Sequence, residues 1–442
     1  MSLQSIASKS AWRYFQRLGG FRRELDTLRK FTSLPADIQR DDLVERMKRT
    51  LRFFSTHSFA LPEWREVAKI EDPQEFLEGW KQIPITTKQD LQGRFSPHLI
   101  RASGLDGTLL SSGGSTGEPT SFLHDASMKR AVSASRIYAN LQRGWTPGVP
   151  IVSVWGSNRD VGIRTRPMMR LAGWLRNTHI LSAFRLDSSV LDDLIRVTSK
   201  MPRFCLYGYT SILTFLAELL LERGDDRFHG RVACAWNGAE TLSSDQSLLF
   251  ERAFGSPLLN HYGGRELSTI AFQRRKELPL SVLRPYIYVE VIPTRDSSSR
   301  GAETGRVICT SLASRATPFV RYEIGDLCQL EAGDVDESGV RSLSSISGRV
   351  TDTIPLPSGT QLHGTYWYHL ATLFPEIAGF QIRWTPASIA ALLVAPGMTD
   401  ERIREYTQRA RLVLKDVPLK VELVAHLPRT PQGKLMKIVR EN

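Results

Sequence analysis

The sequence lacks the features that mark several large protein classes. Its 442 residues contain only four cysteines (Cys205, Cys234, Cys309 and Cys328), and no two of them form a C-x-x-C pair. We therefore expect neither a disulfide framework nor a structural zinc site, but reduced, buried thiols in a cytoplasmic protein. No run of about twenty apolar residues is present, so no transmembrane helix is expected. The N-terminus lacks the apolar core of a signal peptide, although its basic, serine-bearing character leaves a transit peptide open.

The positive charge is not arranged as in a typical nucleic-acid-binding protein. The net charge is +12 and the pI is near 9.7, but the arginines are scattered and many lie beside acidic residues. No basic stripe interleaved with aromatic residues is present, which argues against nucleic acid as the main partner. An enzyme that handles anionic cofactors also gains from a positive field. Charge alone does not decide between the two.

The order of expected helices and strands indicates an α/β fold. Apolar spacing predicts helices over much of residues 1–80, with Thr86 or Thr87 as an N-cap near residue 87. Helix and strand then alternate from residue 126 to residue 262, as in parallel sheets that bind ligands at the strand carboxyl ends. The expected helices are 126–143, 191–199, 212–223 and 243–253, and the expected strands are 151–156, 204–208, 231–238 and 258–262.

The pattern changes twice towards the C-terminus. Strands at 288–292 and 305–310, separated by a polar turn at 295–304, predict a smaller β subdomain within 286–345. Beyond residue 352, an amphipathic helix at 403–414 and a strand at 419–424 fit a compact α+β domain. We therefore expect a large N-terminal domain, 1–352, with a mixed sheet, and a small C-terminal domain, 353–442.

Residues 109–120 are rich in serine, glycine and threonine, and we expect a loop there. Glycines allow the backbone N–H groups to approach an anion, and the hydroxyl groups add hydrogen-bond donors. No Gly-Lys-Ser/Thr follows, so this is not a P-loop of the usual NTPase type. By itself the stretch also fits a flexible linker.

Eight stretches in order along the chain, with the serine-rich loop among them, form a pattern. Together they resemble the motifs of the adenylate-forming superfamily, and most of all its phenylacetate–CoA ligase and CapK-like branch. The resemblance covers residue 80 to the C-terminus. The stretches are 84–91 (PITTKQDL), 111–120 (SSGGSTGEPT), 206–211 (LYGYTS) with 237–240 (NGAE), 260–266 (NHYGGRE), 317–327 (TPFVRYEIGDL), 347–352 (SGRVTD) and 428–434 (PRTPQGK).

The resemblance implies an activity and its cofactors. Such enzymes join a carboxylic acid to ATP with Mg²⁺, releasing pyrophosphate and forming an acyl-adenylate, and then transfer the acyl group. Coenzyme A is the first choice of acceptor. An amine, a hydroxyl or a carrier-protein thiol in a CapK-like polysaccharide or natural-product pathway is the alternative, and a catalytically degenerate nucleotide- or RNA-binding protein is a third. A homodimer stays open, and the acid is not identified.

The resemblance also implies roles for individual residues. Asp326 would bind the ribose hydroxyls, Tyr262 would stack on adenine, and the C-terminal small domain would act as a mobile lid that turns about Asp352. Lys434 would stabilise the negative charge at the α-phosphate, and Glu266 would hold Mg²⁺. The remaining nucleotide-binding residues would be Ser112, Gly113, Gly114, Ser115, Thr116, Gly117, Gly238, Ala239, Glu240, His261, Gly263 and Arg349.

Each role has a plainer alternative. Asp326 could be a turn residue, Tyr262 a core tyrosine, Glu266 the partner of Arg265, and Lys434 part of a solvated basic tail. Arg321 fits a structural role equally well.

The sequence also departs from the common pattern in places. Glu118 stands where many relatives have lysine. Arg164, Arg166 and Arg170 cluster where the acyl pocket is expected, and could bind an acidic substrate or the phosphates of coenzyme A, or lie on the surface.

Overall fold

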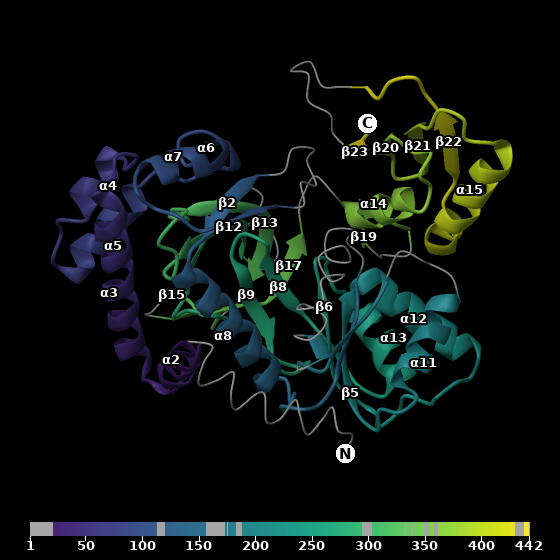
Figure 1. Ribbon diagram of the computed structural model, residues 1–442, viewed down its shortest axis with the longest axis horizontal. Helices are drawn as coiled ribbons and strands as arrows, with labels where there is room; N and C mark the ends of the chain where they lie inside the picture. Colours follow the sequence, from purple (N-terminus) through teal and green to yellow (C-terminus); the bar gives the residue numbers. More distant parts are fainter. Residues whose placement is uncertain are drawn as a thin grey trace.

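The structure is a computed structural model in which helices and several small sheets surround a parallel sheet (Figure 1). Its colours run from the N-terminal helices on one side to the C-terminal region on the other. Among the residues that it describes, no helix is both long and apolar enough to cross a membrane. The described residues are 21–112, 120–155, 173–174, 176–182, 188–293, 303–331, 333–336, 339–348, 353–357, 361–428 and 437–441.

The N-terminal region is helical, as its apolar spacing predicted. Asp72 accepts hydrogen bonds from two backbone N–H groups and caps α5, and Thr87 forms a reciprocal capping box with Asp90 at the start of α6. The predicted N-cap is thus confirmed at Thr87. The helices are α2 (Arg22–Ser33), α3 (Ala36–Ser55), α4 (Pro62–Val67), α5 (Pro73–Gln82), α6 (Lys88–Gln92) and α7 (Pro97–Ala102).

The serine-rich stretch begins within a strand, which corrects the predicted loop at its start. β1 (Thr108–Ser111) and β2 (Ser121–His124) pair antiparallel in a two-stranded sheet, so the chain is still extended at Ser111. Helix α8 (Ala126–Gln142) follows, capped by Asp125, and confirms the helix predicted there.

A five-stranded parallel sheet confirms the predicted alternation. Its strand order is β4–β3–β5–β6–β7, and helices α11, α12 and α13 connect successive strands. The predicted strand 258–262 is in fact two strands: β7 pairs with β6, whereas β8 leaves to join an antiparallel sheet. The bounds are β3 (Ile151–Val154), β4 (Thr178–Leu181), α11 (Ser189–Thr198), β5 (Phe204–Tyr209), α12 (Thr210–Glu222), β6 (Val232–Gly238), α13 (Ser244–Phe254) and β7 (Leu258–Leu259).

Two four-stranded antiparallel sheets, ordered β16–β10–β9–β8 and β11–β12–β13–β17, confirm the predicted β subdomain and extend it. The predicted turn 295–304 ends earlier, because β12 already begins at residue 303. The bounds are β8 (His261–Gly264), β9 (Ser268–Gln273), β10 (Leu280–Val282), β11 (Ile287–Pro293), β12 (Glu303–Ser311), β13 (Tyr322–Leu330), β14 (Val335–Asp336), β15 (Gly339–Val340), β16 (Ser342–Leu343) and β17 (Ser345–Gly348).

The C-terminal region contains the mixed sheet, ordered β22–β21–β20–β23. The α/β fold class is confirmed, but the parallel and antiparallel strands before residue 352 lie in separate sheets. The bounds are β18 (Thr353–Pro355), β19 (Gln361–His363), α14 (Gly364–Thr372), β20 (Gly379–Trp384), β21 (Ile389–Val394), α15 (Asp400–Leu414), β22 (Leu419–Leu423) and β23 (Ile438–Arg440).

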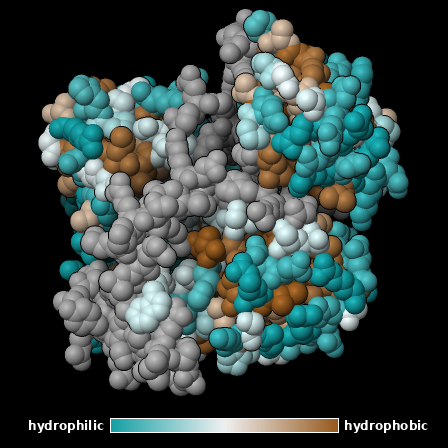
Figure 2. Space-filling view, turned by 45° about the vertical axis from the view of Figure 1, so that its right-hand side comes forward, coloured by the Kyte–Doolittle hydropathy of each residue, from teal (hydrophilic) through white to brown (hydrophobic). Residues whose placement is uncertain are grey.

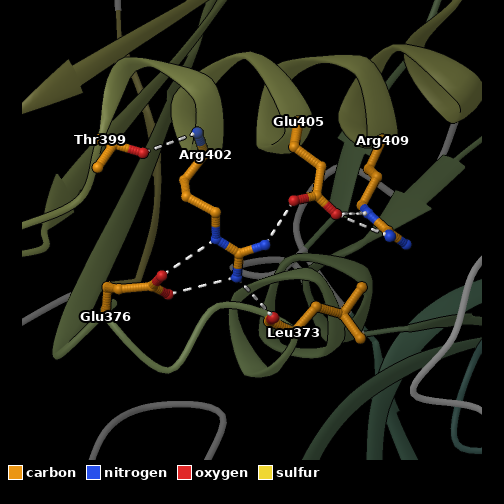
Figure 3. Close-up of polar contacts among 6 residues, drawn as sticks. All are labelled: Leu373, Glu376, Thr399, Arg402, Glu405 and Arg409. Atoms are coloured by element: carbon orange, nitrogen blue, oxygen red, sulfur yellow. Dashed lines mark hydrogen bonds and ion pairs between the residues drawn. The ribbon is translucent and has the colours of Figure 1, made fainter.

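A charge network fixes α15 against the segment that follows α14 (Figure 3). The Arg402 guanidinium donates from Nε to Glu376 at 3.0 Å and also contacts Glu405. Glu405 in turn accepts from Arg409, one turn further along the helix, at 2.9 Å. The Arg402 guanidinium also lies over the Phe374 ring, 4.5 Å from its centroid. The network thus links the charged face of α15 to the apolar core beneath it.

Two large hydrophobic clusters make up most of the core. One joins the N-terminal helices and α8 to the antiparallel sheets. The other joins the parallel sheet and its helices to the C-terminal region, so the two regions share one continuous cluster. On the face shown in Figure 2, hydrophobic residues of the described parts lie in small patches among hydrophilic ones. The site described next lies at the end of β6 and the start of β8.

Candidate active site

Asn237 ties together the segments that meet at the carboxyl end of β6. Its side-chain amide donates to Thr210 Oγ1 and to the backbone oxygen of Glu240, both at 2.9 Å. Its amide oxygen accepts from the backbone N–H of His261 at 2.8 Å. Asn237 is fully buried, and one side chain thus fixes the start of α12, the turn after β6 and the start of β8.

The turn after β6 is built to present its backbone. Ala239 has φ +64°, a left-handed conformation that costs a residue with a Cβ about 1 kcal/mol. Glu240 stabilises the turn, because its carboxylate accepts from the Ser211 N–H at 2.7 Å and from its hydroxyl at 3.0 Å. A Cβ on Gly238 would lie 2.7 Å from the Tyr207 hydroxyl oxygen, so a larger residue would require the Tyr207 side chain to shift. The exposed Ala239 backbone is therefore held in a strained and fixed position.

Tyr262 and Asp326 meet across the two antiparallel sheets. The Tyr262 hydroxyl donates to Asp326 Oδ2 at 2.9 Å, and the tyrosine is 7% exposed. Burial, and then the nearby Asp326 charge, raise the pKa of Tyr262 well above its usual value, so the hydroxyl stays protonated and keeps donating. The bond orients the Asp326 carboxylate. A Cβ on Gly263 would lie 1.9 Å from the Ser268 carbonyl oxygen, which explains the glycine next to Tyr262.

Glu266 is buried and has no ion pair with Arg265 in the part of the chain that the structure describes. Arg265 is exposed and donates instead to the Ser111 carbonyl at 3.4 Å. The Glu266 carbonyl oxygen accepts from His124 Nε2 at 2.7 Å. A carbonyl only accepts, so His124 Nε2 carries a proton. Burial lowers the pKa of His124, and its ring is therefore neutral at pH 7.

Ser112 closes the base of the serine-rich loop. Its N–H donates to the Thr120 carbonyl at 2.9 Å, and its hydroxyl oxygen accepts from the Thr120 N–H at 3.0 Å. The two ends of the loop are thus fixed to each other. Nine predicted or noted positions lie outside the described residues, as do the three clustered arginines Arg164, Arg166 and Arg170: Gly113, Gly114, Ser115, Thr116, Gly117, Glu118, Arg349, Asp352 and Lys434.

Two further predicted residues have clear surroundings. Arg321 is structural: its guanidinium pairs with Glu290 at 3.0 Å in the interior. His261 is partly buried and lies between Arg143, whose Nη2 is 3.2 Å from its Nδ1, and Thr269. Burial and the Arg143 charge lower the pKa of His261 well below its usual value, so its ring is neutral.

Sequence reasoning missed Arg143 and a row of aromatic rings beside it. Trp155, Tyr207 and Trp236 stack in succession, with centroid distances of 5.0 and 5.5 Å. The Arg143 guanidinium lies 5.5 Å from the Trp236 centroid and so continues the row. Trp155 follows β3 and Arg143 follows α8, whereas Tyr207 lies on β5 and Trp236 on β6; of the four, only Tyr207 lies in one of the motifs. Only the aromatic content of the strand ends at 155, 207 and 236 could have signalled them.

Two features lie apart from the predicted site. A cavity of about 520 Å³ separates α3 and α5 from β11 and the β14–β15 hairpin, and it is lined by Arg321 and its partner Glu290 but by none of the described residues predicted to bind the nucleotide or magnesium. All four cysteines are buried and free, as predicted, and the sulfur atoms of Cys205 and Cys234 lie 3.2 Å apart on β5 and β6.

Comparisons with known proteins bear on the fold. No family model matches the chain. Protein CapK of Staphylococcus aureus is 26% identical over 256 residues, which are 57% of this chain and 54% of that protein, so the match spans about half of the relative.

The solved structures of 2-hydroxyisobutyryl-CoA ligase are similar over nearly the whole chain. The ligase in the postadenylation state with R3-HIB-AMP is 18% identical, with 92% of this chain and 91% of that one covered and a TM-score of 0.56. The same ligase with 2-HIB-AMP and CoA, in the thioesterification state, is also 18% identical, with the same coverage and a TM-score of 0.59. The chain therefore has the fold of these ligases, with a large α/β region and a small C-terminal region, as the sequence predicted.

Proposed function

We propose that the chain activates a carboxylic acid with ATP. A carboxylate oxygen attacks the α-phosphorus, the bond from that phosphorus to the bridging oxygen breaks, and pyrophosphate leaves. In the second step the thiol of coenzyme A attacks the acyl carbonyl, its proton passes to solvent or a base, and AMP leaves. The observation that carries the proposal is the Tyr262–Asp326 pair beside the strained Gly238–Ala239 turn.

This arrangement suits an adenosine group. The Asp326 carboxylate, oriented by the Tyr262 hydroxyl, is proposed to accept from the ribose hydroxyls. The Tyr262 ring is proposed to stack on the base, and the exposed Ala239 backbone to lie along the edge of the base. Arg349 is proposed for the ribose or phosphate side and Lys434 for the α-phosphate. Asp352 is proposed as the hinge between domains 1–352 and 353–442.

The residues present fit a magnesium ion. Glu266 supplies a hard carboxylate oxygen from a buried position, and no cation of the described chain already neutralises it. Mg²⁺ bound there would offset phosphate charge. His124, the last residue of β2, donates to the Glu266 carbonyl oxygen and so holds the Glu266 backbone in place.

The acyl acceptor separates the main proposal from its alternative. Because the chain is similar to CapK, we keep an amine, a hydroxyl or a carrier-protein thiol as the second candidate acceptor. Cytoplasmic location and a homodimer stay predictions.

Pyrophosphate release tests the proposal. The purified chain with MgATP is given aromatic, aliphatic and amino-acid carboxylates, each with and without coenzyme A. We expect release with one acid class and acceleration by coenzyme A. Release indifferent to coenzyme A would favour another acceptor. Lys434→Ala should abolish release while ATP binding persists. No release with any acid, together with salt-sensitive RNA retention on a filter, would favour the degenerate RNA-binding alternative.

A further inference from the structure

Arg143, the residue that follows α8, is a buried cation with open hydrogen-bonding capacity. It is 5% exposed. Its Nε donates to the Gln273 carbonyl, and its Nη2 donates to the Asn260 carbonyl, both at 3.1 Å, and to His261 Nδ1. Its Nη1 is buried and has no hydrogen-bond partner among the residues that the structure describes. A guanidinium has five N–H donors, so the two on Nη1 are left unsatisfied there.

The partners of Arg143 are all neutral. They are two carbonyls, an imidazole that is neutral because it accepts at Nδ1, and the rings of Trp236 and Phe272. Among the described residues no Asp or Glu carboxylate pairs with it. Burial lowers the pKa of Arg143 to about 9, which is the direction expected for a desolvated and unpaired cation. Buried charges in proteins are normally paired, because an uncompensated one costs several kcal/mol.

Arg143 also lies against the wall of the proposed site. Its partner His261 directly precedes Tyr262, and Trp236 directly precedes Asn237. From Trp236 the stacked rings of Tyr207 and Trp155 continue across the carboxyl end of the parallel sheet. The wall therefore combines an apolar, aromatic stretch with the Arg143 cation at its end.

We propose that Arg143 binds a second anionic group of the acid substrate, so that the protein activates dicarboxylic acids or acids with a comparable distal anion. The inference rests on the proposed function. A distal carboxylate would accept from both Nη1 donors and neutralise the buried charge. An acid with an apolar tail would displace water and leave the cation unpaired, so the same group would select against it.

Matched pairs of acids test the inference. Pyrophosphate release is measured for glutarate and valerate, adipate and hexanoate, and isophthalate and benzoate. The measured quantity is the ratio of kcat/KM for the diacid to that for its partner. This ratio does not depend on the folded fraction, so a destabilised variant remains informative. We expect the wild-type ratio to favour the diacid in at least one pair by roughly 100-fold.

Variants assign that preference to Arg143. Arg143→Gln should lower the ratio about 100-fold, and Arg143→Lys, which keeps the charge but loses the planar fork, about 10-fold. Arg130→Gln removes a partly exposed arginine of the same helix and should leave the ratio unchanged. The inference would be overturned if the wild type preferred the monoacids or if the ratio were unchanged in Arg143→Gln. Either result would leave the proposed adenylation activity intact. No pyrophosphate with any acid would overturn the proposed function and the inference with it.

Discussion

Arg321 and Arg143 are buried almost equally, at 6% and 5% exposure, but in opposite electrostatic surroundings. Arg321 pairs with Glu290 through two nitrogen atoms, at 3.0 and 3.2 Å, and its Nη1 donates to the carbonyls of Lys81 and Ile83. Trp80 also donates to Glu290, at 3.1 Å. Among the described residues Arg143 has only neutral partners, and its Nη1 has none. The Arg321 charge is paired within the protein, whereas we propose that a ligand pairs the Arg143 charge.

The difference separates a structural from a functional role. The Arg321 pair joins β11 to the backbone after α5, at the start of the strand that carries Asp326, so it positions the site from a distance. Arg143 holds two carbonyls beside β8 and β9 and leaves a charge unpaired next to the site. Burial alone would not distinguish them. The presence or absence of a carboxylate does.

The largest effect is expected when the complete pair is broken. Arg321→Met should lower the free energy of unfolding by about 3–5 kcal/mol, because it leaves the Glu290 carboxylate buried without its cation. Urea denaturation measures the loss. The double variant Arg321→Met/Glu290→Leu should recover most of it, since neither charge is then left buried. A loss below about 1 kcal/mol in the single variant would contradict a structural role for the pair.

A smaller loss is expected at Arg143. Arg143→Met should lower the free energy of unfolding by about 1–3 kcal/mol, because two carbonyls lose their donor but no carboxylate is left unpaired. The same urea assay gives the value. A loss greater than that of Arg321→Met would show that Arg143 is mainly structural and would weaken the contrast between the two arginines.

Tyr262→Phe tests the pair on which the nucleotide site rests. Loss of the hydroxyl that orients Asp326 should raise the KM for ATP about 5- to 10-fold, which corresponds to about 1–1.4 kcal/mol, and change kcat little. Steady-state pyrophosphate release measures both. Tyr138→Phe is the matched control, because it removes a buried hydroxyl that contacts Thr32 among the helices. An unchanged KM in Tyr262→Phe would remove the proposed role of the bond.

The smallest effect concerns pH. His124 and His261 both have a pKa below 6.5 in the folded protein, mainly because of burial. The unfolded chain therefore binds more protons below pH 6.5, so their stabilising contribution is complete above that pH and is lost as the pH falls. We expect a loss of about 0.5–1 kcal/mol between pH 7 and pH 6. His124→Gln keeps a donor to the Glu266 carbonyl and should reduce the change in the free energy of unfolding with pH, which urea denaturation at each pH measures. An unchanged dependence on pH would show that His124 does not contribute to it.

Local patterns predicted much of the fold because they depend on neighbouring residues. Thr87 capped the predicted helix, and the alternation of strand and helix gave the parallel sheet. The split of 258–262 into β7 and β8 was not predictable, because the apolar run is continuous and only pairing partners in space separate it. The prediction of a mixed sheet before residue 352 was wrong for the same reason, because the sequence does not show which strands pair.

For the site, the sequence by itself determined which residues to consider, since the ordered motifs contain Gly238, Tyr262, Glu266 and Asp326. Only the tertiary structure decided how they are used. It joined Tyr262 to Asp326, turned Glu240 towards Ser211, and separated Glu266 from Arg265. It also buried Arg143 without a carboxylate. Hydrogen bonds and charge pairs form between residues distant in the chain, and their energies depend on a burial that no local pattern records.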